Sequence, residues 1–401
     1  MGSSNRWLRR LTALGASAVL LAVVVGCTTI ASPRDGDIGP FATGAHAGAV
    51  DSGAVGSASV GSGAVGSGAV SSGLSGTVNN ITASFDYRDR LITPLAHLYG
   101  KFLADFVVIT VKNDNTSSVK VVAMSEIPGF TNQITDTVTV DAGASKEILQ
   151  NPRLTSTAIN GLNSEKQADV HIVVSYLDNG QSRTVLDQTA ATTITSRRDF
   201  PWVIDGMTAT QDYQLLAAMI TPTDPKVEEL ITKAAKYDPQ KVMTSGYTKA
   251  ADANHDVWQR LSDLWQAETT DYHLTYVSTT ETFDQNSQRI RLPTEVLTGG
   301  SGNCIETSLL FAAAAEALGL TPVIVIVPGH AYMGVNLDGQ GTSWYFVETT
   351  MIGRYGFADA LKEGNTEWST ASAHVDAGEK DYGYVDVLQA RKDGVTPIPW
   401  S

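Results

Sequence analysis

Short runs of strand-forming residues alternate with turn signals between residues 77 and 200. The runs lie at 102–111, 119–123, 137–140, 170–176 and 184–186. Asp178-Asn179-Gly180 separates the last two runs and favours a hairpin. Several short strands with such turns are typical of two packed sheets, so the pattern predicts an all-β sandwich of immunoglobulin-like architecture. No cysteine lies in this range, so the cysteine pair of true immunoglobulin domains is absent and the prediction concerns architecture alone.

After about residue 220, apolar residues take up helical spacing. Helices are predicted to begin near residues 225, 254 and 304, and the third one ends at Leu318, where Gly319 follows as a stop signal. Apolar runs then predict three strands, at 323–327, 330–337 and 344–348. This mixture of elements predicts that an α+β domain, formed by residues 201–401, follows the sandwich.

Residues 1–26 have the composition of an export signal. Three arginines precede a mostly apolar run at 11–25, which is short for a membrane span of about 20 residues. The run ends in Val24-Val25-Gly26-Cys27, which resembles a bacterial lipobox, and that resemblance implies that Cys27 carries lipid. An uncleaved membrane anchor is the alternative. Both interpretations place the rest of the chain outside the cytoplasmic membrane, and the first predicts a membrane-anchored lipoprotein.

Residues 27–76 are rich in glycine, serine and alanine and include five related pentads between 48 and 72. Such small residues bury too little apolar surface to offset the entropy of the chain, so the composition predicts a flexible linker. Regular packing of the valine that recurs every fifth residue is the alternative.

The charge balance bears on the class of partner. The formal net charge is −14, and removing residues 1–26 leaves 25 basic against 42 acidic side chains. Nucleic-acid binding requires clustered lysine and arginine, so we expect no nucleic-acid partner. The chain has only two cysteines, Cys27 and Cys304. If Cys27 is acylated, Cys304 has no partner for a disulfide, and catalysis is the simplest role for a lone exported thiol.

Cys304 stands in a sequence that favours nucleophilic chemistry. Glycines at 299, 300 and 302 allow a tight turn, and the predicted helix then starts at Cys304, where the helix dipole and free backbone N–H groups favour a thiolate. Glu306 falls in the first turn and is expected to cap the helix. His330 follows Cys304 by 26 residues and Glu348 follows His330 by 18, on neighbouring predicted strands. This order predicts a nucleophile, a base and an orienting acid.

These segments resemble the transglutaminase-like superfamily, whose fold is related to the papain-like cysteine proteases. The resemblance covers about residues 252–360, the expected core of the second domain, and is sharpest over 293–353. The residues that carry it are Gly302-Asn303-Cys304-Ile305-Glu306, Ala317-Leu318-Gly319-Leu320, His330-Ala331-Tyr332 and Glu348-Thr349-Thr350.

The resemblance implies that Cys304 is the nucleophile, His330 the base and Glu348 the acid that orients it. It also implies an upstream aromatic residue at the oxyanion hole, for which Tyr276 is the first candidate and Tyr272 the second. Two positions depart from the family: Glu348 stands where aspartate is usual, and Tyr332 replaces the common tryptophan.

The expected function is therefore that of an extracytoplasmic cysteine enzyme that cleaves peptide or carboxamide bonds, or transfers acyl groups, through a thioester. The expected partners are a protein or peptide substrate and the membrane that holds the lipid anchor. We expect no cofactor and no metal, because the glycines lack the ending of a P-loop and the seven histidines lack zinc-ligand spacing. The alternatives are a non-catalytic cell-envelope binding or scaffold lipoprotein, and an enzyme whose site forms only on assembly with a partner.

Overall fold

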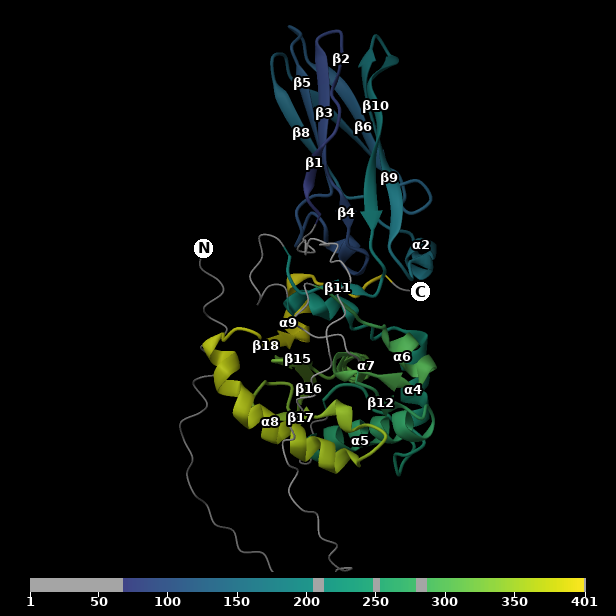
Figure 1. The fold of residues 1–401 in the computed structure, drawn as a ribbon, viewed down its shortest axis with the longest axis vertical. Helices are drawn as coiled ribbons and strands as arrows, with labels where there is room; N and C mark the ends of the chain where they lie inside the picture. The colour runs from purple at the N-terminus through teal and green to yellow at the C-terminus, as the bar shows by residue number, and fades with distance from the viewer. Residues whose placement is uncertain (1–67, 205–212, 248–252, 279–286, 400–401) are drawn as a thin grey trace, which may run out of the picture. The chain divides into compact units, whose positions relative to one another are not determined.

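The computed structural model describes residues 68–204, 213–247, 253–278 and 287–399. The predicted signal at 1–26, the lipidation residue Cys27 and the linker up to residue 67 lie outside the described residues. Within the described ranges, no helix has the length and apolar character needed to cross a membrane. A part made mostly of strands is followed by a part that mixes helices with small sheets (Figure 1), so the described residues form a mixed structure of sheets and helices.

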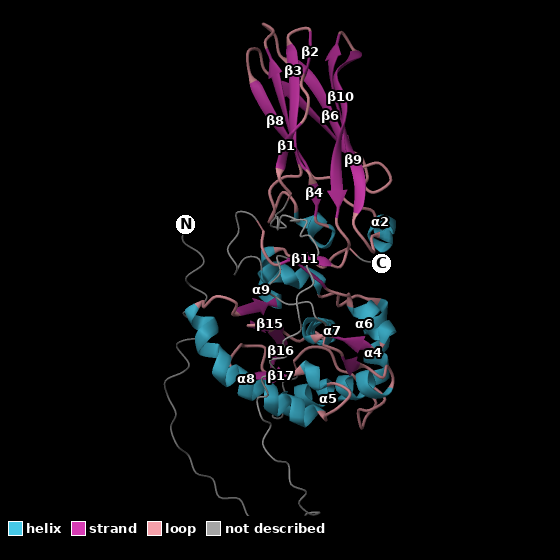
Figure 2. Ribbon diagram, in the orientation of Figure 1, coloured by secondary structure: helices cyan, strands magenta, loops and turns pink. Residues whose placement is uncertain are grey.

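Two five-stranded sheets make up the first part (Figure 2). One sheet contains β1 (Val70–Ser72), β2 (Gly76–Val78), β3 (Ile81–Arg88), β5 (Val107–Asn113) and β8 (Ser145–Gln150). The other contains β4 (Arg90–Leu91), β6 (Val119–Glu126), β7 (Ile134–Val140), β9 (Lys166–Asp178) and β10 (Gln181–Ile194). Buried residues alternate with more exposed ones along β3 and β6, as expected for strands with one face in a core.

The first sheet begins earlier in the chain than the sequence predicted. Strand β1 and Gly76, the first residue of β2, fall inside the predicted linker. Val70 pairs with Arg88 and Gly76 with Ala83 of β3. The linker prediction was therefore wrong for 70–72 and 76. Backbone hydrogen bonds hold such strands to their neighbour without large apolar side chains, and Val70 is 60% exposed, so hydrophobic patterning gave no signal for them.

The connection to the second part runs through β11 (Asp199–Pro201), which pairs with β13 (Ser287–Arg289). The strand therefore spans the predicted boundary between residues 200 and 201. Two short helical elements belong to the first part, η2 (Thr93–Leu98) and α2 (Ser156–Gly161).

A four-stranded antiparallel sheet lies at the centre of the second part. Its order is β17 (Trp344–Val347), β16 (His330–Asn336), β15 (Pro322–Val327) and β18 (Gly383–Asp386). Two further strands, β12 (Thr275–Tyr276) and β14 (Ser301–Gly302), pair in parallel. The helical elements are η3 (Leu216–Met219), α4 (Pro225–Ala234), α5 (Ala253–Thr270), α6 (Pro293–Gly299), α7 (Cys304–Ala317), η4 (Thr349–Met351), α8 (Phe357–Ala377) and α9 (Val387–Asp393).

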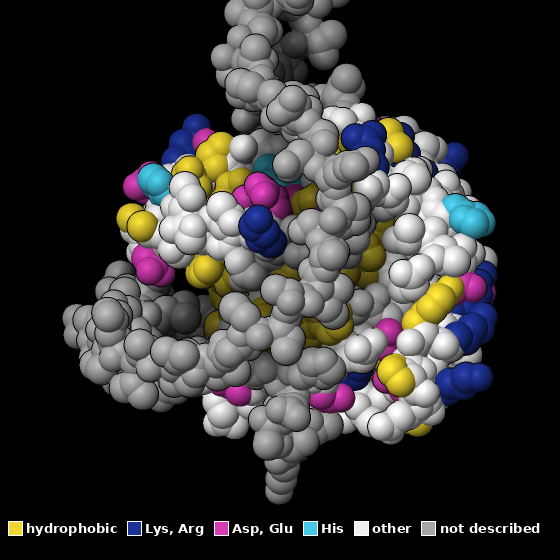
Figure 3. All heavy atoms as spheres, turned by 90° about the horizontal axis from the view of Figure 1, so that it is seen from below, with side chains coloured by type: hydrophobic (Ala, Val, Ile, Leu, Met, Phe, Trp, Pro, Cys, Tyr) yellow, Lys and Arg dark blue, Asp and Glu magenta, His cyan; other side chains and the backbone are white. Residues whose placement is uncertain are grey.

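The sheet has two differently packed faces. Ile324, Ile326 and Met333 point to the main core, which also contains α7, a helix buried on nearly all sides. Val325 and Phe346 belong to a second cluster, against which Trp368 and Tyr384 pack. Helices α7 and α8 therefore pack on the sheet from different directions. On the face drawn in Figure 3, the acidic and basic side chains of the described residues are interspersed.

Candidate active site

Cys304 is the first residue of α7, and local hydrogen bonds determine where this helix begins. The Asn303 side chain accepts a hydrogen bond from the Glu306 N–H at 3.0 Å, and Glu306 Oε2 accepts one from the Asn303 N–H at 3.1 Å. This reciprocal pair is a capping box. Arg291 adds a donor, since its Nη2 lies 2.6 Å from Glu306 Oε2. The capping role predicted for Glu306 is therefore confirmed.

A glycine is required just before the cysteine because the chain passes close to its neighbours there. A Cβ at Gly302 would lie 2.9 Å from Thr307 Cγ2 and 3.2 Å from Val296 Cγ1. Gly300, two residues earlier, has a φ of 60°, in the left-handed region that glycine adopts at low cost. The glycines therefore allow α6 to turn tightly into the start of α7.

Buried hydroxyl groups connect the helix of Cys304 to the segment of Glu348. Thr307 Oγ1 donates to Thr349 Oγ1 at 3.0 Å, and Ser308 Oγ lies 2.9 Å from the same oxygen. Because Thr349 directly follows Glu348, these contacts hold α7 in register with the end of β17.

His330 and Glu348 come from neighbouring strands and meet through a short hydrogen bond. His330 begins β16, which pairs antiparallel with β17, and Glu348 follows the last residue of β17. His330 Nε2 lies 2.6 Å from Glu348 Oε2. The other carboxylate oxygen, Oε1, accepts hydrogen bonds from the N–H and the hydroxyl of Thr350. Glu348 is only 3% exposed, so these contacts hold its carboxylate in one orientation.

The imidazole of His330 also contacts the thiol. Burial lowers the pKa of His330, but hydrogen bonds with Cys304 and Glu348 and their negative charges more than offset this and raise it to about 10. The histidine therefore keeps its proton at neutral pH. Burial raises the pKa of Glu348, but the hydrogen bond with His330, the positive charge of His330 and the hydrogen bond from Thr350 act together against burial and lower that pKa. An imidazolium beside Cys304 favours the thiolate, which is the reactive form of cysteine. The structure thus brings together the three residues predicted as nucleophile, base and acid.

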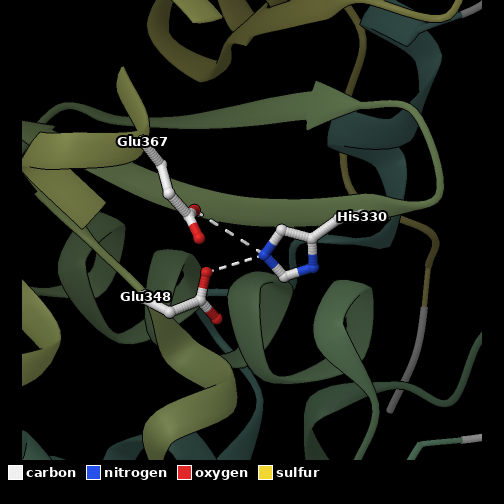
Figure 4. A group of neighbouring side chains, drawn as sticks. All are labelled: His330, Glu348 and Glu367. Atoms are coloured by element: carbon white, nitrogen blue, oxygen red, sulfur yellow. Dashed lines mark hydrogen bonds and ion pairs between the residues drawn. The ribbon is translucent and has the colours of Figure 1, made fainter. Parts of the chain in front are cut away.

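A fourth side chain, Glu367 of α8, also lies at the site and was missed by sequence reasoning. Figure 4 shows the carboxyl groups of Glu348 and Glu367 both directed at Nε2 of His330. Glu367 Oε2 is 3.8 Å from this nitrogen, which exceeds hydrogen-bonding distance. The one available signal was its place on α8, next to the apolar stripe that includes Gly364 and Trp368.

His330, Glu348 and Glu367 also offer three potential metal ligands whose atoms lie within 4.8 Å of one another. Two ligand atoms of one zinc ion lie about 3 Å apart or more, because each bond measures roughly 2 Å. The 2.6 Å between His330 Nε2 and Glu348 Oε2 is shorter and fits a direct hydrogen bond. The expectation of no metal stays a prediction.

Tyr276, the first oxyanion candidate, lies near the site through its backbone. It is the second residue of β12 and pairs with Gly302, two residues before Cys304. Tyr272, the second candidate, packs its ring under Lys233 of α4, whose Nζ lies 4.0 Å from the ring centroid. The strand pairing favours Tyr276 by position, and its oxyanion role stays a prediction.

Comparison with known proteins gives no family for this chain. No family model and no curated protein matches it. A crystal structure of a protein from Archaeoglobus fulgidus aligns with 32% of this chain and 95% of its own length, at 12% identity and a TM-score of 0.19. A solution structure described as a late embryogenesis abundant (LEA) protein aligns with 32% of this chain and 71% of its own, at 8% identity and a TM-score of 0.17. A Bacteroides uniformis beta-glucuronidase 2 structure aligns with 52% of this chain and 26% of its own, at 8% identity and a TM-score of 0.15. TM-scores this low carry no inference about fold or function.

Proposed function

We propose that residues 201–401 form a transglutaminase-like cysteine enzyme that cleaves or transfers acyl groups at peptide or carboxamide bonds. The observation that carries the proposal is the position of His330, which contacts both the thiol of Cys304 and the carboxylate of Glu348. A buried structural cysteine requires neither of these contacts. The helix start, the imidazole and the buried carboxylate together are what nucleophilic catalysis by cysteine needs.

Each residue has a defined part in the proposed reaction. The thiolate of Cys304 attacks the carbonyl carbon, and the first N–H groups of α7 stabilise the negative charge that forms on the carbonyl oxygen. His330 then gives its proton to the leaving nitrogen, the carbon–nitrogen bond breaks, and a thioester remains. Water or an amine next loses a proton to His330 as it attacks the thioester, and the sulfur leaves as thiolate. Glu348 holds the imidazole in orientation and stabilises its charged form.

The rest of the proposal concerns the setting of this enzyme. The two sheets of the first part act as an immunoglobulin-like sandwich that spaces the enzyme or binds a partner. The arginines and the lipobox-like residues that end in Cys27 support export and a lipid anchor, so the substrate is a protein or peptide of the cell envelope. Water as acceptor gives hydrolysis, and an amine gives crosslinking.

The test is the rate at which iodoacetamide alkylates Cys304 in the full chain between pH 5 and 9. Mass spectrometry of the peptide that contains Cys304 separates it from Cys27. We expect fast labelling at pH 6–7 and a loss of at least tenfold in His330→Ala, because the imidazolium no longer supports the thiolate. The control is His171→Ala, which removes an imidazole paired with Asp187 in the first part.

Slow labelling that does not respond to His330→Ala would contradict the proposed enzyme activity and favour the binding or scaffold alternative. Fast alkylation of Cys304 justifies a second assay, which measures ammonia release from carboxamide peptides with and without an added amine. That assay separates hydrolysis from transfer.

A further inference from the structure

The second carboxyl group at His330 is held in place by the packing of α8 against β17. The Glu348 N–H donates to the Ala360 carbonyl at 2.9 Å, and the Phe346 N–H donates to Asn365 Oδ1 at 3.2 Å. A Cβ at Gly364 would lie 2.5 Å from the carbonyl carbon and oxygen of Phe346, so only glycine permits this approach. The helix therefore lies directly on β17, the strand that Glu348 follows.

Glu367 follows in the next turn of α8. The adjacent Trp368 stacks on Phe346, with ring centroids 4.4 Å apart and an interplanar angle of 14°. This stacking and the contact at Gly364 fix the Glu367 backbone. Its side chain reaches the site from the side of α8, as Figure 4 shows.

A carboxylate oxygen of Glu367 lies within 4.8 Å of one of Glu348. Two carboxyl groups at this separation cannot both ionise at low cost. Burial raises the pKa of Glu367, and the charge of Glu348 and a hydrogen bond with it raise it further, to about 8. Glu348 keeps its charge because it accepts hydrogen bonds from His330 and Thr350. At neutral pH Glu367 is thus the protonated partner and Glu348 the carboxylate.

We propose that Glu367 is a positioning residue that acts through Glu348: its acid form donates a hydrogen bond that holds the Glu348 carboxylate against His330, and its ionisation removes this support. The inference rests on the proposed function, because it concerns the orientation of the same imidazole. The ionisable groups that face Glu367 are Glu348, His330 and Tyr332, together with Glu363 on its own helix.

The test compares Glu367→Gln, Glu367→Ala and the control Glu363→Gln in the full chain. Glutamine keeps the length and a donor but cannot ionise, whereas alanine removes both. Glu363 is exposed on the same helix, so Glu363→Gln makes the same change of side chain at a position outside the site. Two quantities are measured: the alkylation rate of Cys304, and the NMR chemical shift of the His330 ring from pH 6 to 9.

We expect a step in the His330 shift near pH 8 in the parent chain and in Glu363→Gln, and its absence in Glu367→Gln. Alkylation at pH 7 should stay within about twofold of the parent in Glu367→Gln and fall about tenfold in Glu367→Ala, the effect of one hydrogen bond to a charged group. If Glu367 had only a general structural role, Glu367→Gln would not remove the step in the His330 shift while leaving the alkylation rate of Cys304 unchanged. Thermal unfolding of each variant shows whether it is folded.

The inference is overturned if Glu367→Gln retains the step, or if Glu367→Ala reacts like the parent. Failure of the proposed function looks different: Cys304 of the parent itself reacts slowly and does not respond to His330→Ala. The NMR measurement still tests the pairing of Glu367 with Glu348 in that case.

Discussion

Removing the charge of Glu348 should lower the pKa of His330, and the size of this effect can be worked out from the site. The pKa of His330 is raised from the usual 6.5 to about 10, although burial alone lowers it. The two partners therefore contribute more than the net shift. An opposite charge at this distance typically contributes about 1–3 pKa units. In Glu348→Gln the pKa of His330 should thus fall to between about 7 and 9, a change of about 1.4–4 kcal/mol in the stability of the imidazolium.

The assay is an NMR titration of the full chain labelled with 13C in its histidine rings. The chain has seven histidines, so the His330 signal is assigned by its loss in His330→Ala. Cys304→Ala should also lower the midpoint. With both partners removed in a chain that also carries Glu367→Gln, burial acts alone and the midpoint should fall below 6.5, because burial disfavours the charged imidazole. Circular dichroism at each pH confirms that the chain remains folded.

Two results would refute this account of the site. A midpoint near 6.5 in the parent chain would mean that the partners of His330 do not stabilise its charge. A raised midpoint that is unchanged in Glu348→Gln would mean that the 2.6 Å hydrogen bond contributes nothing to it.

Three further predictions test other parts of the site. Glu306→Ala should destabilise the second part by about 1–3 kcal/mol and slow the alkylation of Cys304, because the half-buried Arg291 loses its hydrogen-bonded partner. Urea unfolding measures the stability and mass spectrometry the alkylation rate, and an unchanged urea midpoint would contradict the prediction. Gly364→Ala should cost about 1–3 kcal/mol, because the added methyl group meets the backbone of Phe346; thermal unfolding measures it, and a neutral effect would mean that α8 shifts freely. The fold should also lose stability as the pH rises from 6.5 to about 10, at up to about 1.4 kcal/mol per pH unit, because His330 keeps in the folded chain a proton that it loses in the unfolded one. Urea titrations at several pH values measure this slope, which His330→Ala should flatten, and an equal slope in both chains would argue against the raised pKa of His330.

The parts of the site that could be predicted are those that depend on residues close together in the sequence. Asn303 and Glu306 form a capping box that can be recognised from their spacing, and it fixes Cys304 as the first residue of α7. Short turns join the three strands at 322–347, so neighbouring strands pair antiparallel. That pairing brings His330 beside Glu348.

Other features depend on contacts that local sequence does not record. The strand predicted at 102–111 begins only at Val107, because residues 100–103 form a turn in which the Gly100 N–H donates to the Leu103 carbonyl at 2.8 Å. Strand-forming side chains alone did not reveal this turn. The edge strand β1 likewise pairs through its backbone and has no apolar pattern.

Glu367 shows why a site can be only partly predicted from its sequence. A glutamate on a long helix usually faces solvent, and its neighbour Glu363 does. What distinguishes Glu367 is that Gly364 lets α8 approach the backbone of Phe346, which brings the next turn of the helix to Glu348. The position of Glu367 therefore depends on how a helix packs on a strand, and the sequence of neither segment alone predicts that packing. The nucleophile, base and acid follow from local signals, whereas the group that sets the protonation of the acid depends on tertiary packing. For this reason Gly364→Ala should change the pH dependence of the His330 shift as well as stability, although residue 364 carries no ionisable group.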